Sequence, residues 1–188
     1  MIFDMATLAT HLVTADEFLG MEFDTDCRFE LDNGVVRMMG GGTFRHSRIQ
    51  TNVLVALAQK LQGSGCEPLG PDMGVRNHRL SVRYPDVSVY CGRGGLENDK
   101  LTAFDDPKLV VEVMSPSTRT RDIEVKLPEY RMTPSLDAIL YIDPEDETVH
   151  LELRNEKGEW AVVVGGPDDP IDLPTLGVTL SRKEIFSR

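Results

Sequence analysis

Apolar positions along the chain recur with two different periods. From Ile49 to Leu61 they recur every four residues, which is the spacing of one face of an α-helix, so a helix is predicted near residues 44–62. The run Leu109–Met114 (LVVEVM) is dense in β-branched residues and predicts a central, buried strand. Asn-Gly at 33–34, between two short apolar runs, is a strong signal for a β-hairpin.

The remaining segments complete a mixed pattern of helices and strands. We predict a short helix from Thr14 and loop with a short strand over 66–77. Residues 79–82 and 87–91 are expected to be two strands or one long bent strand, and 138–143 a further strand. A helix from about Thr118, a hairpin across 155–158, and a final strand with a helical turn complete the chain. This order favours an α/β fold, an α+β mixed sheet with a helix on each side and hairpins at its periphery.

The length of 188 residues suits a single domain, 1–188, and a hydrophobic content of 40% allows that domain to bury a real core. Within it we expect an N-terminal helix and hairpin (1–43), a core that carries the candidate chemistry (44–143), and a C-terminal hairpin and tail (144–188). No apolar run approaches the roughly 18 residues that a membrane span needs.

Charge and cysteine content limit which partners, metal sites and cellular compartment are expected. The formal net charge of −11 counts against tight, unaided binding to duplex DNA, because such binding usually requires a basic footprint. Three widely spaced cysteines, Cys27, Cys66 and Cys91, form no CxxC motif, so neither a disulfide nor a zinc site is expected. The start of the chain has an acid at Asp4 and no basic leader, and together these features favour the cytoplasm.

Two acids stand beside the predicted buried strands. In Leu109–Met114, Glu112 shares a face with Val110 and Met114, so it sits among apolar neighbours. An unpaired buried carboxylate is costly and should therefore have a cation, a metal ion or a proton. Asp86 follows Pro85 at the mouth of the strand 87–91, and if the two strands pair, both acids can converge at one edge of the sheet.

Two carboxylates directed at one point repel each other unless a cation is present. Mg²⁺ or Mn²⁺ suits Asp86 and Glu112, because hard cations prefer oxygen ligands and are often held by one or two carboxylates plus substrate phosphates. Such a metal supports cleavage of phosphodiester bonds. Lys126, on the following helix and four residues after Asp122, is the candidate for positioning the attacking water.

These residues resemble a known family. Pro85-Asp86 followed by Glu112 on a strand is similar to the PD-(D/E)xK superfamily of restriction-endonuclease-like proteins, and more closely to the bacterial Uma-two family, which is common in cyanobacteria. The segments that carry the resemblance are FELDNGVV, the helix with His46, YPDVSVY, LVVEVMSPSTRTRD, Lys126 with Tyr130, and YIDP. The resemblance implies a metal-dependent nuclease core with Asp86 and Glu112 as ligands.

The chain departs from the superfamily pattern at the lysine. That lysine usually lies two residues after the glutamate, where this chain has Met114, and Lys126 on the next helix matches the place that the family uses instead. Pro128 would clash with the carbonyl of Glu124 in a continuous helix, so a kink there would alter the direction of Lys126.

For several residues a purely structural role is an alternative to a role in catalysis or binding. Glu30, in FELDNG, is a further candidate acid that the resemblance supports, although a solvated hairpin acid is favoured. His46 could contact phosphate or carry a proton, but a plain helix-start histidine is favoured. Lys126 and Asp122 could be a surface ion pair, and the pair Arg119 and Arg121 could contact phosphate or be solvated.

The sequence therefore predicts a magnesium- or manganese-dependent endonuclease that hydrolyses nucleic acid, with DNA the expected substrate. Asp86, Glu112 and Lys126 are the predicted catalytic residues, and Glu30, His46 and Asp122 are additional candidates. Cutting of both strands usually needs two active centres, which favours a homodimer. The alternative is a catalytically silent module of the same fold that partners a DNA-handling protein, and the net charge and the displaced lysine favour it.

Overall fold

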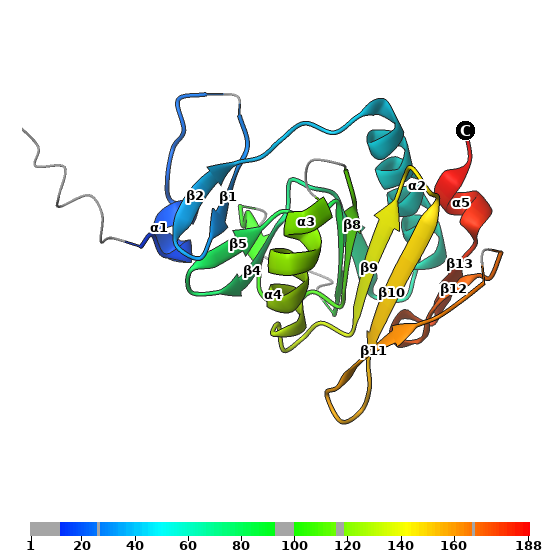
Figure 1. The fold of residues 1–188 in the computed structure, drawn as a ribbon. Coiled ribbons are helices and arrows are strands. Elements are labelled where there is room, and N and C mark those ends of the chain that lie inside the picture. The colour runs from blue at the N-terminus through cyan, green and yellow to red at the C-terminus, as the bar shows by residue number, and fades with distance from the viewer. Residues whose placement is uncertain (1–11, 26, 93–99, 116–118, 167) are drawn as a thin grey trace, which may run out of the picture.

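The computed structural model describes residues 12–25, 27–92, 100–115, 119–166 and 168–188, and shows a mixed α/β protein (Figure 1). Its main sheet has six strands in the order β11-β10-β9-β8-β6-β3. A second sheet of five strands has the order β2-β1-β5-β4-β7, and β12 and β13 form a small separate pair. Each of the two larger sheets contains one parallel pairing, β8 with β9 and β4 with β7, so both are mixed.

The strands of the three sheets have the following bounds: β1 Phe29–Asp32, β2 Val35–Met38, β3 Cys66–Leu69, β4 Gly74–His78, β5 Ser81–Arg83, β6 Val87–Cys91, β7 Ala103–Phe104, β8 Leu109–Val113, β9 Ala138–Asp143, β10 Thr148–Arg154, β11 Trp160–Val163, β12 Ile171–Leu173 and β13 Val178–Leu180. The helices are α1 Ala15–Leu19, α2 Phe44–Lys60, α3 Arg119–Arg121, the π-helical turn η1 Asp122–Lys126, α4 Leu127–Arg131, the 3₁₀ turn η2 Pro174–Leu176 and α5 Arg182–Phe186. None of them is long and apolar enough to cross a membrane, within the residues described.

The main sheet is covered by a helix on each face. Ile49, Val53 and Leu57 of α2 pack against Val111 and the other strand residues that point the same way. On the opposite face, Tyr130 of α4 packs in a separate cluster with Val110, Met114 and Ile139. The alternation of β8 between these two clusters confirms the predicted strand and the predicted division of its side chains.

Local turn chemistry also follows the sequence. Asn33 and Gly34 adopt positive φ angles of 47° and 82°, as the tight turn of a hairpin requires, and β1 pairs antiparallel with β2 around them. The hairpin across 155–158 is confirmed as β10 and β11. The predicted helix start at Thr118 lies outside the described residues, and the described helix begins at Arg119.

Three predictions in the region 66–91 are wrong. The stretch 66–77 contains two strands, β3 and β4, instead of loop and one short strand, and residues 79–80 form the turn between β4 and β5 instead of the start of a strand. Cys66 and Cys91, expected to be free thiols, form a disulfide. They face each other because β3 pairs antiparallel with β6 in the register Cys66↔Cys91, which their separation in the sequence does not reveal.

Candidate active site

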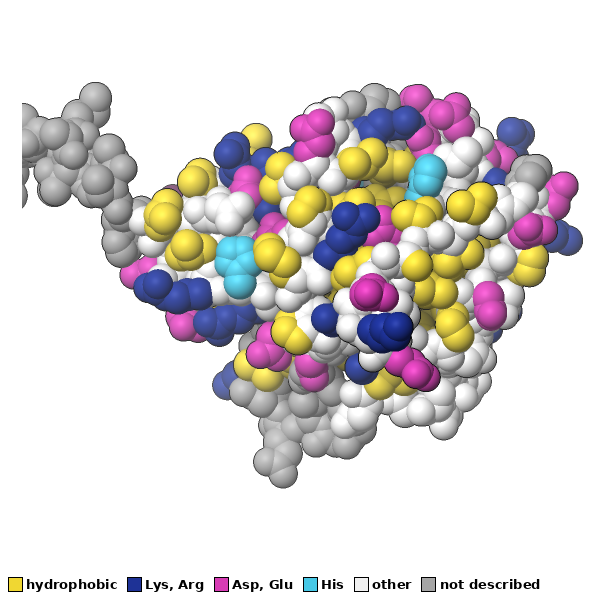
Figure 2. Space-filling model, turned by 60° about the horizontal axis from the view of Figure 1, so that its bottom comes forward, with side chains coloured by type: hydrophobic (Ala, Val, Ile, Leu, Met, Phe, Trp, Pro, Cys, Tyr) yellow, Lys and Arg dark blue, Asp and Glu magenta, His cyan; other side chains and the backbone are white. Residues whose placement is uncertain are grey.

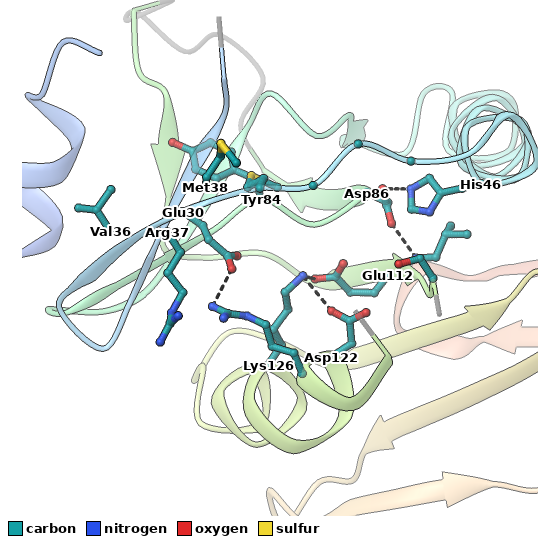
Figure 3. A pocket seen from close by; sticks show the side chains of 17 residues that line it. Glu30, Val36, Arg37, Met38, His46, Tyr84, Asp86, Glu112, Asp122 and Lys126 are labelled. Carbon is teal, nitrogen blue, oxygen red and sulfur yellow. Dashed lines mark hydrogen bonds and ion pairs between the residues drawn. The ribbon is translucent and has the colours of Figure 1, made fainter. Parts of the chain in front are cut away.

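A pocket of about 470 Å³ lies between the β1–β2 hairpin, the start of α2, the ends of β6 and β8, and the turn η1 (Figure 3). Its lining includes all six candidate residues from the sequence, which are Glu30, His46, Asp86, Glu112, Asp122 and Lys126. Four of these are acids and come from four separate parts of the fold, so the chain concentrates negative charge at one place.

Asp86 and Glu112 lie at the same end of the main sheet because of the register between β6 and β8. Val87 is opposite Val111 in this antiparallel pair, and one further step along the register brings Asp86 opposite Glu112. Opposite residues in an antiparallel pair share one face of the sheet. The Asp86 Oδ2 atom also accepts a hydrogen bond of 2.7 Å from the Val113 amide, which fixes this carboxylate beside the end of β8.

Glu112 is buried, with 4% of its surface exposed, and it is surrounded by polar partners. Its Oε1 atom accepts hydrogen bonds from the Lys126 amine at 3.1 Å and from the Tyr130 hydroxyl at 2.7 Å. Both donors use Oε1, so among the described residues Oε2 has no hydrogen-bond donor and is left for another ligand. Of the three partners expected for a buried Glu112, a cation, a metal ion or a proton, Lys126 supplies the cation.

Burial raises the pKa of Glu112 to about 7, against the opposing attraction of Lys126, and the neighbouring Asp122 and Asp86 add to the rise. Burial alone would lower the pKa of Lys126, but the acids Glu112 and Asp122 outweigh it and hold that pKa above its ordinary value. Lys126 therefore keeps its proton, whereas the charge of Glu112 can change near neutral pH.

Lys126 points into the pocket, where its amine lies 3.1 Å from Glu112 Oε1 and 3.1 Å from Asp122 Oδ1 (Figure 3). The helix avoids a clash at Pro128 by forming the π-helical turn η1, in which the Leu127 amide donates to the carbonyl of Asp122 five residues earlier. Single π turns of this kind occur frequently at functional sites. The lysine is 8% exposed, so the alternative of a surface ion pair with Asp122 is wrong.

His46 contacts Asp86 directly. Its Nε2 atom lies 2.8 Å from Asp86 Oδ1, and its side chain is 16% exposed. Gly42 makes room for this arrangement, because a Cβ atom there would lie 2.8 Å from the imidazole Cδ2. The hydrogen bond to Asp86 raises the pKa of His46 against the effect of burial. His46 is therefore part of the pocket, and the preference for a plain helix-start histidine is not supported.

Sequence reasoning missed Arg83, which organises the side of the pocket next to β1. This arginine is 0% exposed and forms ion pairs with Asp32 at 2.7 Å, Glu129 at 2.6 Å and Glu30 at 3.3 Å. Glu30 is thus a buried, paired acid, so the preference for a solvated hairpin acid is wrong. The signal was available: Glu30 and Asp32 are two residues apart on a strand, and two acids on one face need a cation nearby.

The arginines after β8 are also paired. Arg121 lines the pocket and donates to Glu30 and Asp32, each at 2.8 Å, while Arg119 forms an ion pair with Asp143. The Arg121 side chain is 28% exposed and that of Arg119 is 43% exposed, so Arg119 remains solvated as well as paired. Arg121 places a positive charge on the pocket wall beside Glu30.

The donor set fits a hard divalent cation that is held by few protein ligands. Among the residues that the structure describes, no group of three or more histidine, cysteine or acidic side chains is close enough to hold a metal ion. Asp86 and Glu112 nevertheless share one face of the sheet, and the Oε2 atom of Glu112 has no donor among the described residues. Mg²⁺ commonly binds through one or two carboxylates and keeps several waters or phosphate oxygens, so two carboxylates are sufficient.

Tyr130 provides a test of the charge on Glu112. Its hydroxyl is buried and donates to the carboxylate, whereas the hydroxyl of Tyr141 donates to the backbone carbonyl of Asp122 at 3.1 Å. Hydrogen bonds to charged groups contribute more than those to neutral ones. At pH 8, Tyr130→Phe should lower the free energy of unfolding by about 2 kcal/mol and Tyr141→Phe by about 1 kcal/mol. Urea unfolding measures both, and equal losses would show that Glu112 carries no charge at that pH.

The fold and the pocket define a mixed α/β protein with an acidic site at the end of its main sheet. The model of the Uma2 family, described as "Putative restriction endonuclease", matches residues 15–183. Because that match spans most of the sequence, the chain belongs to the Uma2 family.

Individual proteins are also similar to this chain. The uncharacterized protein slr1290 of Synechocystis sp. (strain ATCC 27184 / PCC 6803 / Kazusa) is 27% identical over 93% of this chain and 91% of its own length. The uncharacterized protein sll1609 of the same organism is 28% identical over 74% of this chain and 79% of its own. A crystal structure of a putative nuclease belonging to DUF820 from Anabaena variabilis ATCC 29413 matches with a TM-score of 0.72 at 21% identity, covering 93% and 98% of the two chains. That likeness establishes the shared fold.

Proposed function

We propose that the protein is a restriction-endonuclease-like hydrolase that cleaves phosphodiester bonds of nucleic acid, with DNA the expected substrate and Mg²⁺ or Mn²⁺ the cofactor. The observation that carries the proposal is the placement of Asp86 and Glu112 on one face of adjacent strands, with the Lys126 amine against Glu112. The family description and the solved relative, a putative nuclease, support the same class of reaction.

Each residue has a distinct role in this proposal. Asp86 and Glu112 would hold the metal ion, which supplies Lewis-acid stabilisation of the phosphate and activation of water. Lys126, which keeps its proton, orients the attacking water by donating to it and offsets the negative charge that develops on the phosphate. His46 holds Asp86 through its hydrogen bond, and Asp122 holds the Lys126 amine from the other side.

A catalytically silent module is the second candidate function, and three observations favour it. The net charge is −11, and within the part of the chain that the structure describes no three-ligand metal cluster exists. Acidic and basic side chains also intermingle on the face shown in Figure 2, without a continuous basic stripe among the side chains drawn in colour. In this case the pocket would be a remnant and the protein would bind no metal ion there.

Metal-dependent cleavage distinguishes the two candidates. Asp86→Asn keeps the side-chain size and an acceptor for the Val113 amide but removes the charge that would hold the metal ion. We expect a loss of Mn²⁺-dependent DNA cleavage of about 100-fold or more, because the metal contributes several kcal/mol to transition-state stabilisation. Cleavage is measured on labelled DNA with and without Mn²⁺.

The matched control is Asp146→Asn, an exposed acid away from the pocket, which should leave cleavage and Mn²⁺ binding unchanged. Wild-type protein that neither cleaves DNA nor gains thermal stability from Mn²⁺ would support the silent module. A dimer, measured by light scattering, would agree with the need for two active centres in cutting both strands.

A further inference from the structure

A second pocket of about 280 Å³ lies beside the candidate active site and has a different character. Its walls are largely aromatic and aliphatic, with Phe18 and Leu19 from α1, then Met21 and Phe23, and Phe29 from β1. The rings of Phe23 and Phe29 stack with centroids 4.3 Å apart, and Phe23 and Phe18 are tilted at 6.0 Å. Phe23 remains 38% exposed, so a ring face or edge is available to a ligand.

The two pockets adjoin each other and share lining residues. Tyr84 and Met39 line both of them, and Tyr84 is separated from Asp86 only by Pro85. Two residues span at most about 7 Å of chain, so the apolar pocket begins roughly one nucleotide away from the proposed metal site. Gly74 allows Tyr84 to pack closely in this position, because a Cβ atom there would lie 3.2 Å from the tyrosine Cε1 atom.

Charge and composition indicate how nucleic acid would gain affinity here. An acidic protein gains little from phosphate contacts, whereas stacking of a base on an aromatic ring does not depend on net charge. Among the charged side chains that line the second pocket, Arg28 is already paired with Asp72. The pocket therefore offers stacking and apolar contact, the features that proteins use to bind unpaired bases.

We propose that this pocket, formed around Phe23, Phe29 and Tyr84, binds one unpaired nucleobase of the nucleic acid whose phosphodiester lies at Asp86 and Glu112. The proposal rests on the proposed nuclease function and specifies its substrate class as single-stranded nucleic acid, or a duplex with an unpaired base. A fully paired duplex cannot place a base in this pocket without unstacking it, which costs free energy.

The test measures binding without cleavage. Fluorescence anisotropy with a short labelled oligothymidylate in EDTA gives the Kd of wild-type protein, and the same strand annealed to oligoadenylate gives the Kd for duplex. We expect the single strand to bind about tenfold tighter or more. Phe23→Ala and Phe23→Leu should both weaken single-strand binding by about tenfold, because each removes the ring, whereas Phe23→Trp should retain it. Phe44→Ala, which removes an 80% exposed ring outside both pockets, is the matched control and should change nothing.

The outcomes separate this inference from the function on which it rests. Binding by Phe23→Leu that equals wild type, equal affinity for duplex and single strand, or no binding of either would overturn the base pocket. The proposed nuclease function is judged instead by Mn²⁺-dependent stabilisation and by Asp86→Asn. Phe23→Leu should leave the Mn²⁺-dependent rise in melting temperature unchanged, since Phe23 does not line the metal pocket.

Discussion

Replacement of Arg83 by methionine should lower the free energy of unfolding by about 3–5 kcal/mol, because it leaves buried acids without their cation. Arg83 is fully buried and compensates Asp32, Glu129 and Glu30 from two different elements. Methionine preserves much of the side-chain length and supplies no charge. The loss is measured by urea unfolding at pH 8.

The loss should shrink as the pH falls below about 5, where the stranded acids take up protons and no longer repel one another. Arg45→Met is the matched control: Arg45 pairs with Glu147 at 2.7 Å, but the two side chains are 45% and 52% exposed. It should cost less than about 1 kcal/mol. Equal losses of unfolding free energy in the two variants would show that the buried ion pairs of Arg83 stabilise the fold no more than the exposed pair of Arg45 does.

The parts of the fold that depend on local signals were predictable. The Asn-Gly hairpin and the period of α2 follow from turn chemistry and hydrophobic spacing, and both are present. The two faces of β8 follow from alternation alone, and this placed Glu112 correctly among buried neighbours. Predictions of this kind succeed because the physical cause lies within a few residues of its effect.

The parts that depend on strand pairing were not predictable. The disulfide between Cys66 and Cys91 requires the register of β3 with β6, and the role of Arg83 requires β5 to lie beside β1. The sequence predicted a clash at Pro128 but not how the backbone avoids it, and the structure has a π-helical turn there. For the disulfide and for Arg83, the interacting residue lies on a strand that is distant in the sequence. For the turn before Pro128, the helix could either kink or form a π-helical turn, and the sequence does not choose between them.

Glu112→Gln should change two properties most: the pH dependence of the free energy of unfolding, and the binding of a metal ion. The pKa of Glu112 is raised from 4.5 to about 7 in the folded protein, so its contribution to stability is fully present below pH 4.5 and is lost as the pH rises through about 7. At pH 8 the ionised carboxylate then costs up to about 3 kcal/mol. Glutamine removes that cost but also removes the attraction to Lys126, so the metal-free variant should be equally stable or more stable than wild type.

The difference between the two proteins should be greatest at pH 8 and small near pH 5, where Glu112 is protonated. Glu124→Gln, at an exposed position of the same turn that holds Lys126, is the matched control and should show no such trend. Urea unfolding of the metal-free proteins at the two pH values measures these effects. A wild-type protein that loses no stability between pH 5 and pH 8 relative to Glu112→Gln would place the pKa of Glu112 near its ordinary value.

Glu112→Gln should weaken metal binding, although it does not lower the stability of the metal-free protein. At a Mn²⁺ concentration of about 100 times Kd, wild-type protein should gain about 2.7 kcal/mol, because the ion binds only the folded state. Glu112→Gln should lose most of this gain, since one of two charged ligands is missing, while Glu124→Gln should keep it. Melting curves with and without Mn²⁺ at pH 8 provide the comparison. An equal gain in wild type and Glu112→Gln would mean that Glu112 is not a ligand, and the nuclease proposal would lose its chemical basis.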